Sequence, residues 1–185
     1  LICRQRIRDA IVAAGGVRLT DYTGQNEKVM PTGLITQLAG ETFDAVFVTL
    51  KCHQLEASVA DLKQLAEGGA QLFFMQNGLG SVDLIRHQLP SDKLKQGITP
   101  FNILSLDNAH FHRGTEGAFL FNQTSVTEQL AGELGAIGFP CQLHADMQPV
   151  IYGKLLLNLN NALNAIAQAF PSTPKPRKPT VTSPR

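Results

Sequence analysis

The sequence predicts an α/β protein with a doubly wound, mostly parallel sheet. Two uncharged apolar runs, at 45–50 and 72–75, have the length and continuity of strands that are covered on both faces. A stretch with helical periodicity follows the first run at 54–67, and this alternation of strand and helix is typical of doubly wound sheets. Because such sheets bind ligands beyond the carboxyl ends of their strands, the residues that follow the two runs are the first candidates for a site.

The composition is that of a globular protein. Of 185 residues, 43% are hydrophobic and 17% are charged, which excludes a disordered or fibrous chain. No stretch reaches the roughly 18 continuous apolar residues of a membrane span, and no signal peptide opens the sequence. The three cysteines, Cys3, Cys52 and Cys141, have no paired spacing, so we expect a protein of the reducing cytoplasm that does not contact a membrane.

The last fifteen residues, 171–185, differ from the rest. They carry four basic residues, no acidic residue and five of the ten prolines, with almost nothing apolar, so we expect a disordered tail. Without them, twelve basic residues face fifteen acidic ones, and the net charge is −3 instead of +1. That balance is not the basic footprint of a nucleic-acid-binding protein, and no nucleic-acid partner is predicted.

The elements before the first apolar run are predicted from glycines, periodicity and turn residues. Gly15 and Gly16 end a helix, and a turn at 23–26 joins two extended segments into a hairpin. In order, we expect the end of a strand at 1–3, a helix at 4–14, hairpin strands at 17–22 and 27–30, and a loosely helical segment at 34–39.

The elements from the first apolar run onward alternate between strands and helices. Pro90 ends one helix and Pro100 interrupts a strand, while Ser125-x-x-Glu128 is a capping box that opens another helix. In order, we expect strand 44–50, helix 54–67, strand 71–76, helix 81–90, an interrupted strand 94–106, an antiparallel hairpin 110–121, helix 125–138 and a short strand 141–143. A longer helix at 146–170 then begins what we expect to be a second, helical domain.

Polar residues stand directly after the two apolar runs. Lys51 and Gln54 follow the first run, and Asn77 and Gly78 follow the second. At the carboxyl ends of neighbouring parallel strands, they would lie together at the edge where a ligand binds. Simpler interpretations stay open: a lysine that reaches water at a strand end, and an Asn-Gly turn.

A polar stripe runs along the predicted last helix. Lys154, Asn158 and Asn161 are spaced i, i+4 and i+7, so they project from one face. Asn is a poor helix former, costing roughly 0.5 kcal/mol relative to Ala. Either this face meets water, or it lines a cleft in which an ammonium and amides grip a small polar molecule. A carbonyl substrate would suit the cleft, because its reduction builds negative charge on oxygen that a lysine can stabilise and protonate.

Other reactive side chains predict no further site. His110 and His112 would share one strand face, but no third metal ligand is evident, so no metal is expected. Cys52 lies beside Lys51, yet no His-Asp pair supports a catalytic nucleophile.

Together these regions resemble the ketopantoate reductase (2-dehydropantoate 2-reductase) family, whose members reduce 2-dehydropantoate to pantoate with NADPH. The similarity covers about 1–169 and rests on five motifs in the family's order and spacing: Phe43-DAVFVTLKCHQ, Met75-QNGLG, Gln96-GITPFN, Phe111-HRGTEG and Tyr152-GKLLLNLNNALNA. Each motif alone is weak, and their combination is specific.

The resemblance implies a Rossmann-like NADP-binding domain followed by a helical domain, with the active site between them. We therefore expect a partial NADP-binding domain at 1–145, the first helix of the helical domain at 146–170, and the tail at 171–185. The resemblance makes a small keto acid the expected substrate and NADPH the expected cofactor, and we expect a homodimer as the assembly.

The resemblance also implies how the substrate is held. Lys154 matches the family's catalytic lysine, which holds the substrate and protonates its carbonyl oxygen. Asn158, one turn further on, matches a substrate-binding asparagine. The family's second such asparagine corresponds to Ala162, and Asn161 stands beside that position.

Three residues match positions that contact the cofactor in the family, and two more lie beside or near such positions. Lys51 and Asn77 match residues at the ribose and nicotinamide end, with Gln54 beside them. Arg4 matches the arginine that favours NADPH by pairing with its 2′-phosphate. Ile103 falls near the segment whose backbone touches the nicotinamide.

The chain departs from the family at both ends. It has no strand, G-x-G-x-x-G and helix unit, whose backbone amides cradle the pyrophosphate, and most of the helical domain is missing. We therefore expect an incomplete chain, an NADP-dependent oxidoreductase by lineage that is inactive by itself. Two alternatives stay open: a related NADP-dependent reductase of another 2-keto or 3-hydroxy acid, and a non-catalytic remnant.

Overall fold

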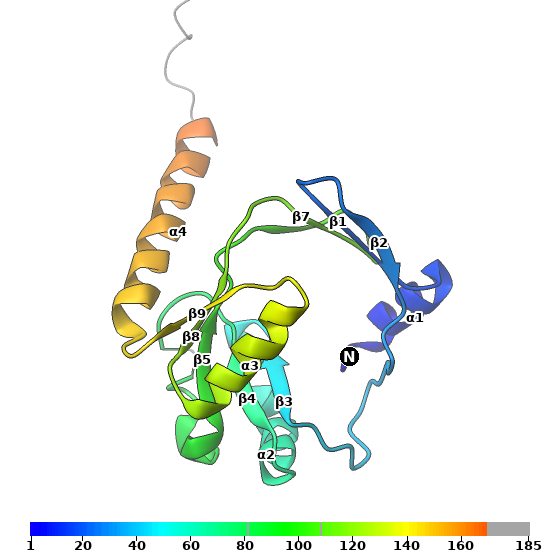
Figure 1. Cartoon of the computed structure of the whole chain (residues 1–185), viewed down its shortest axis with the longest axis vertical. Coiled ribbons are helices and arrows are strands. Elements are labelled where there is room, and N and C mark those ends of the chain that lie inside the picture. Colours follow the sequence, from blue (N-terminus) through cyan, green and yellow to red (C-terminus); the bar gives the residue numbers. More distant parts are fainter. Residues whose placement is uncertain (81, 108, 170–185) are drawn as a thin grey trace, which may run out of the picture.

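In the described part of the chain, the strands form two sheets (Figure 1). The computed structural model describes residues 1–80, 82–107 and 109–169, without the side chains at 161, 164, 165 and 167–169. The α/β class with parallel strands is confirmed, and the described strands divide between a five-stranded and a four-stranded sheet. The predicted tail at 171–185 lies outside the described residues.

The five-stranded sheet contains both apolar runs. Its strands, in the spatial order β3-β4-β5-β8-β9, are β3 (Ala45–Val48), β4 (Gln71–Phe74), β5 (Leu94–Ile98), β8 (Phe119–Asn122) and β9 (Cys141–His144). β3, β4 and β5 are parallel, β8 runs antiparallel to β5, and β9 runs parallel to β8. The carboxyl ends of β3, β4 and β5 therefore meet at one edge, as the sequence predicts.

The four-stranded sheet has the order β2-β1-β7-β6. Its strands are β1 (Val17–Asp21), β2 (Asn26–Val29), β6 (Ile103–Ser105) and β7 (His110–Arg113). The antiparallel pairing of β1 with β2 confirms the predicted first hairpin. β1 also pairs in parallel with β7, and β6 pairs antiparallel with β7.

Two strand predictions fail at the boundary between the sheets. The expected strand 94–106 is two strands, β5 and β6, in different sheets, and the expected hairpin 110–121 is not formed, because β7 and β8 also belong to different sheets. The reason is side-chain packing. Phe119 and Phe121 of β8 stack with each other, and Phe121 meets the edge of Phe73 in β4, so β8 joins the apolar sheet.

Four α-helices accompany the sheets in the described residues. They are α1 (Gln5–Ala14), α2 (Val59–Glu67), α3 (Ser125–Ala136) and α4 (Gln148–Ala169). Gly15 takes the left-handed conformation that ends α1, with φ of 67°, as expected of a C-terminal glycine. α2 begins later than predicted, after two 3₁₀ turns at Cys52–Gln54 and Glu56–Ser58.

Two helix predictions are wrong. The segment 34–39 is not helical, because Ile35 forms a parallel bridge with Ile2 beside the chain start. Between 82 and 90 the described chain forms turns and one 3₁₀ turn at Arg86–Gln88, while Ser81 lies outside the described residues. Further 3₁₀ structure occurs at Ser91–Lys93.

The N-cap of α3 is Thr124, not the predicted Ser125. Its hydroxyl accepts a hydrogen bond from the amide of Thr127 at 3.2 Å. Thr127 is fully buried, and its own hydroxyl donates to the carbonyl of Asn122 at 2.6 Å, which fixes the helix start one residue earlier.

The main core lies between β3, β4 and α2. Leu72 and Phe74 point into it together with Leu62 and Leu65 of the helix. Phe73, between them on the strand, faces the other side and stacks with Phe47, at 5.4 Å between ring centroids. The interior strand β4 is thus covered on both faces, which explains why its sequence is a continuous apolar run.

The long helix α4 extends away from both sheets (Figure 1). Ile151 in its first turns, together with Met147 just before the helix, packs against Ile98 of β5. Further along, Leu156 and Leu163 are 67% and 65% exposed. None of the described helices has the length and hydropathy needed to cross a membrane.

Candidate functional site

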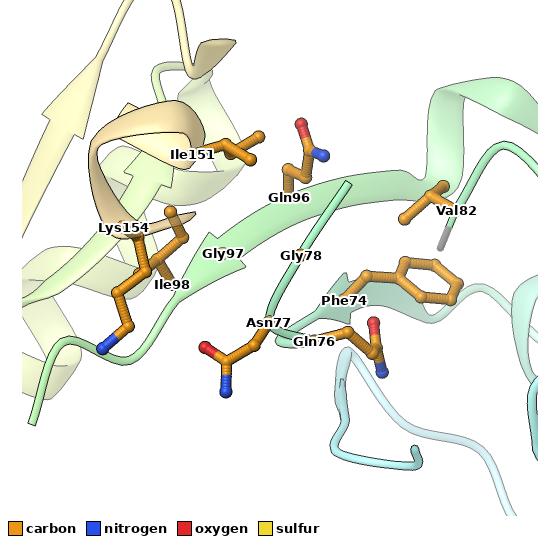
Figure 2. Close-up of a pocket in the computed structure, with 10 residues that line it drawn as sticks. All are labelled: Phe74, Gln76, Asn77, Gly78, Val82, Gln96, Gly97, Ile98, Ile151 and Lys154. Atoms are coloured by element: carbon orange, nitrogen blue, oxygen red, sulfur yellow. The ribbon is translucent and has the colours of Figure 1, made fainter. Parts of the chain in front are cut away.

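A narrow pocket lies where the carboxyl ends of β4 and β5 meet the first turns of α4 (Figure 2). Its walls combine apolar side chains with amides and one ammonium. The lining residues are Phe74, Gln76, Asn77, Gly78, Val82, Gln96, Gly97, Ile98, Ile151 and Lys154. The pocket therefore stands at the sheet edge that the sequence predicts for a ligand.

The pocket brings together Lys154 and Asn77. Lys154 is half-buried on α4, and its Nζ donates to the carbonyl oxygen of Pro100 at 3.5 Å. Asn77 is exposed and lies three residues after the end of β4. Figure 2 shows both side chains extending toward the same side of the pocket. Two regions 77 positions apart in the sequence thus contribute polar groups to one cleft, as the predicted site requires.

Local packing explains why these two residues arrive there. Ile151 lies one turn before Lys154 and packs on Ile98, so the start of α4 is held against the end of β5. After Asn77 the chain turns at Gly78, whose φ of 97° belongs to the left-handed region that favours glycine. The turn leaves the carboxamide of Asn77 at the open end of the strand.

Lys51 and Gln54 lie at the neighbouring strand end, outside the residues that line the pocket. The carboxamide oxygen of Gln54 accepts a hydrogen bond from the amide of Lys51 at 3.2 Å, and the amide of Gln54 donates to the Lys51 carbonyl at 2.8 Å. Gln54 therefore holds the backbone of Lys51, while the Lys51 side chain is exposed. A further link joins this loop to the pocket, where Cys52 Sγ donates to the Asn77 carbonyl at 3.9 Å.

The structure does not bring the other predicted residues to the pocket walls. Arg4 is exposed at the N-cap position of α1. Ile103 belongs to β6 in the four-stranded sheet and is 51% exposed. Asn158 is half-buried one turn after Lys154. Asn161 falls within α4, but its side chain lies outside the described part of the chain.

Sequence reasoning overlooked the part that Gln76, Gln96 and Gly97 play in the pocket wall. All three belong to motifs that carry the family resemblance, so the motif membership itself was the available signal. Gly97 is needed because of close approach: a Cβ there would lie 2.7 Å from Cε1 of Phe121. A side chain at this position would push against the aromatic core below the pocket.

The pocket carries a positive charge. Lys154 is the cation among the lining residues, and the set contains no aspartate or glutamate. Elsewhere in the described residues, no group of three or more His, Cys, Asp and Glu side chains could hold a metal ion. His110 and His112 each lie 3.0 Å from the hydroxyl of Thr20, so both imidazoles bond to the neighbouring strand.

The arrangement suits a small polar molecule with an electron-rich oxygen. An ammonium can stabilise negative charge that develops on a carbonyl oxygen and can donate a proton to it. Ile98 and Ile151 flank the lysine with apolar surface, which weakens the competition of water for the same charge. A carboxamide, as in Asn77, adds both a donor and an acceptor.

Comparison with known proteins identifies the family. A family model described as "Ketopantoate reductase PanE/ApbA" matches residues 1–125. The chain is 25% identical over 174 residues to the 2-dehydropantoate 2-reductase of Bacillus subtilis (strain 168), an alignment that covers 91% of this chain and 56% of that protein. The chain thus spans a little over half the length of this curated relative.

Solved structures share the fold. The 2-dehydropantoate 2-reductase from Porphyromonas gingivalis W83 superposes with a TM-score of 0.74 at 21% identity, over 94% of this chain and 61% of that one. D-mandelate dehydrogenase in complex with NADH superposes with a TM-score of 0.66 at 18% identity, over 85% of this chain and 51% of that one.

Proposed function

The chain belongs to the ketopantoate reductase PanE/ApbA family, and from this we propose that its site serves the NADPH-dependent reduction of the ketone of 2-dehydropantoate to (R)-pantoate, a step in pantothenate and coenzyme A biosynthesis. One observation carries the proposal: Lys154 and Asn77 line the same pocket at the carboxyl ends of parallel strands. An ammonium at that edge can protonate the oxygen of a keto acid, and a carboxamide there can hydrogen-bond to a dinucleotide that binds at the strand ends.

Lys154 is the proposed general acid. The hydrogen bond of its Nζ to the Pro100 carbonyl is long, at 3.5 Å, so the ammonium can exchange that partner for a substrate oxygen at little cost. As negative charge builds on the former carbonyl oxygen, the lysine stabilises it and transfers a proton. Asn158, one turn later on α4, and Asn161 are proposed to bind the rest of the substrate.

The residues at the strand ends fit one end of NADPH, which when bound would supply a hydride. Asn77 and Lys51 offer a carboxamide and an ammonium to ribose hydroxyls, with Gln54 and Ile103 as further proposed contacts. At Gly78 no atom lies within 4 Å of a built Cβ, so the turn has room for a ligand to approach. Arg4 is exposed and can pair with a 2′-phosphate. The sequence has no G-x-G-x-x-G cradle for the pyrophosphate.

We further propose the domain division expected from the resemblance, with 1–145 as the dinucleotide-binding part and the helix from 146 as the start of a helical domain. A cytoplasmic homodimer belongs to the same proposal. Sedimentation of the purified chain tests the assembly against the monomer mass of 20.1 kDa.

The experiment is an NADPH oxidation assay with 2-dehydropantoate on the full reading frame that contains this sequence and on its Lys154→Ala variant, because the 185-residue chain by itself is expected to be inactive. We expect turnover to fall by roughly 10²–10⁴-fold in the variant, because the proton donor is lost. Lys63→Ala, which removes an exposed lysine of α2, is the matched control and should retain full activity. Turnover that survives Lys154→Ala would remove the lysine from the mechanism.

A related 2-keto acid is the second candidate substrate. D-mandelate dehydrogenase shares this fold, and the described pocket wall has apolar side chains that do not single out one acyl group. Oxidation of D-mandelate with NAD⁺, measured beside 2-dehydropantoate reduction, separates the two reactions. If the product of the full reading frame neither binds NADPH nor turns over either substrate, the chain is the non-catalytic remnant.

A further inference from the structure

Beyond the paired part of β3 and β4, the side chain of Gln76 continues the connection between the two strands. The parallel ladder ends where the amide of Met75 donates to the Val48 carbonyl at 3.2 Å. Nε2 of Gln76 then donates to the same carbonyl at 2.7 Å and to the Leu50 carbonyl at 3.0 Å. These bonds tie the residue before Lys51 to the residue before Asn77.

The chemistry of this contact calls for a carboxamide. Both acceptors are carbonyl oxygens, and the NH2 of a carboxamide can donate to both of them without burying a charge of either sign. Glutamine has that group at this length. Glutamate would set a carboxylate against two carbonyl oxygens, and asparagine is one methylene shorter.

The two carbonyl groups that accept hydrogen bonds from Gln76 would have other partners without it. The Val48 carbonyl has the Met75 amide as a second partner, and Leu50 is 36% exposed, so water can reach its end of the loop. The amide oxygen Oε1 of Gln76 is itself buried without a partner in the described structure. An unsatisfied buried acceptor costs stability, so packing alone does not explain a glutamine here.

We propose that Gln76 is a positioning residue, which sets the separation of Lys51 and Asn77 by holding the loop after β3 against the loop after β4. Cys52 reports on the same separation, since its Sγ lies 3.9 Å from the Asn77 carbonyl. The effect on ligand binding rests on the proposed NADPH site, whereas the effect on loop geometry does not.

The first test needs no cofactor. In a Cys3→Ser/Cys141→Ser background, the rate at which a thiol reagent labels Cys52 should rise several-fold in Gln76→Met, because the loops separate more often. Gln71→Met is the matched control: Gln71 lies at the other end of β4 and also has a buried, unpartnered Oε1. Equal labelling rates in both variants would overturn the proposal.

Thermal unfolding separates positioning from a purely structural role. Gln76→Met should unfold at nearly the same temperature as Gln71→Met, because the carbonyls it leaves retain other partners. Gln76→Asn, which keeps the amide and loses its reach, should give the same labelling rate as Gln76→Met. A much lower unfolding temperature for both Gln76 variants than for the control would assign Gln76 to stability and overturn the proposal.

The second test measures NADPH binding by fluorescence titration. Gln76→Met should weaken NADPH binding roughly tenfold when Lys51 is present and much less in the Lys51→Ala background. The reason is that Gln76 is proposed to act on binding partly by positioning Lys51. Additive losses would overturn the coupling. The titration uses the full reading frame that contains this sequence; if that protein does not bind NADPH, the proposed function is overturned and the labelling result stands by itself.

Discussion

The two sheets of this protein differ in how they are covered, although both contain parallel strands. In the five-stranded sheet, Leu72, Phe73 and Phe74 of β4 are at most 1% exposed. In the four-stranded sheet, every residue of the outer strands β2 and β6 is exposed. The candidate pocket lies at the carboxyl edge of the first sheet, where a covered strand ends abruptly in polar residues.

The difference between the sheets shows why the end of a covered strand can hold binding residues in fixed positions. A strand packed on both faces cannot shift without disrupting the core, so the residues just beyond it have defined positions. Asn77 and Gly78 follow such a strand. Ile103, on the exposed strand β6, has no comparable support and is not among the residues that line the pocket.

The largest expected effect comes from truncating the covered sheet. Phe73→Ala removes a fully buried ring that stacks on Phe47 and meets Phe121, and we expect it to lower the free energy of unfolding by about 3–5 kcal/mol. Leu104→Ala in β6, where the side chain is 54% exposed, should change that free energy by about 0.5 kcal/mol or less. Urea unfolding measures both, and equal losses would contradict the contrast between the sheets.

A smaller loss of stability is expected from adding a methyl group at Gly97, below the pocket, where the neighbouring side chains leave no room. The Cβ of Gly97→Ala would lie 2.7 Å from Cε1 and 2.9 Å from Cδ1 of Phe121, and it would also meet the Met75 sulfur, so we expect a loss of about 1–3 kcal/mol. Gly132→Ala is the control, because nothing lies within 4 Å of a Cβ there and the site is inside α3. That control should gain about 0.5–1 kcal/mol in urea unfolding. A Gly97→Ala protein as stable as wild type would show that the ring moves freely.

The smallest effect concerns the exposed sheet and depends on pH. The hydroxyl of Thr23, followed by backbone amides and Arg113, holds the pKa of Asp21 below its ordinary value. Because the pKa is lower in the folded state, the carboxylate stabilises the fold above the unfolded-state pKa of about 4, and this contribution is lost as pH falls through the folded-state pKa. We expect Asp21→Asn to destabilise the protein at neutral pH.

Urea midpoints measured from neutral to acidic pH check the sign. The gap between wild type and Asp21→Asn should stay constant above about pH 5 and narrow below pH 4, where the wild-type carboxyl takes up its proton. A gap that widens on acidification would contradict the assigned direction. The pocket variants Gly97→Ala and Lys154→Ala should show no such dependence.

Strands covered on both faces, and helices with clear ends, could be predicted from the sequence. The apolar run of β4 and the glycine that ends α1 are recognisable from neighbouring residues alone. Strands whose pairing partner is distant in the sequence could not be predicted in this way. The predicted hairpin at 110–121 failed because β7 finds its partner in β1, about ninety residues earlier, and no local pattern records that pairing.

The same distinction holds for the candidate site. The sequence placed Lys154 on a polar helix face and Asn77 at a strand end, since periodicity and strand termini are local properties. It did not show that the carboxamide oxygen of Gln54 accepts a hydrogen bond from the Lys51 amide, or that the side chain of Gln76 donates to a carbonyl of β3. Side-chain hydrogen bonds to backbone depend on how close two loops lie, which residue order alone does not specify.

By itself, the sequence determined the α/β class, the apolar strands β3 and β4 and the polar residues beyond them. Strands that are buried on two faces need continuous apolar runs, and the ends of these runs mark the sheet edge where the candidate pocket lies. The tertiary structure alone decided which sheet each later strand joined and which predicted residues share a pocket. Those outcomes depend on contacts such as Phe121 with Phe73 and Ile151 with Ile98, which form between elements far apart in the chain.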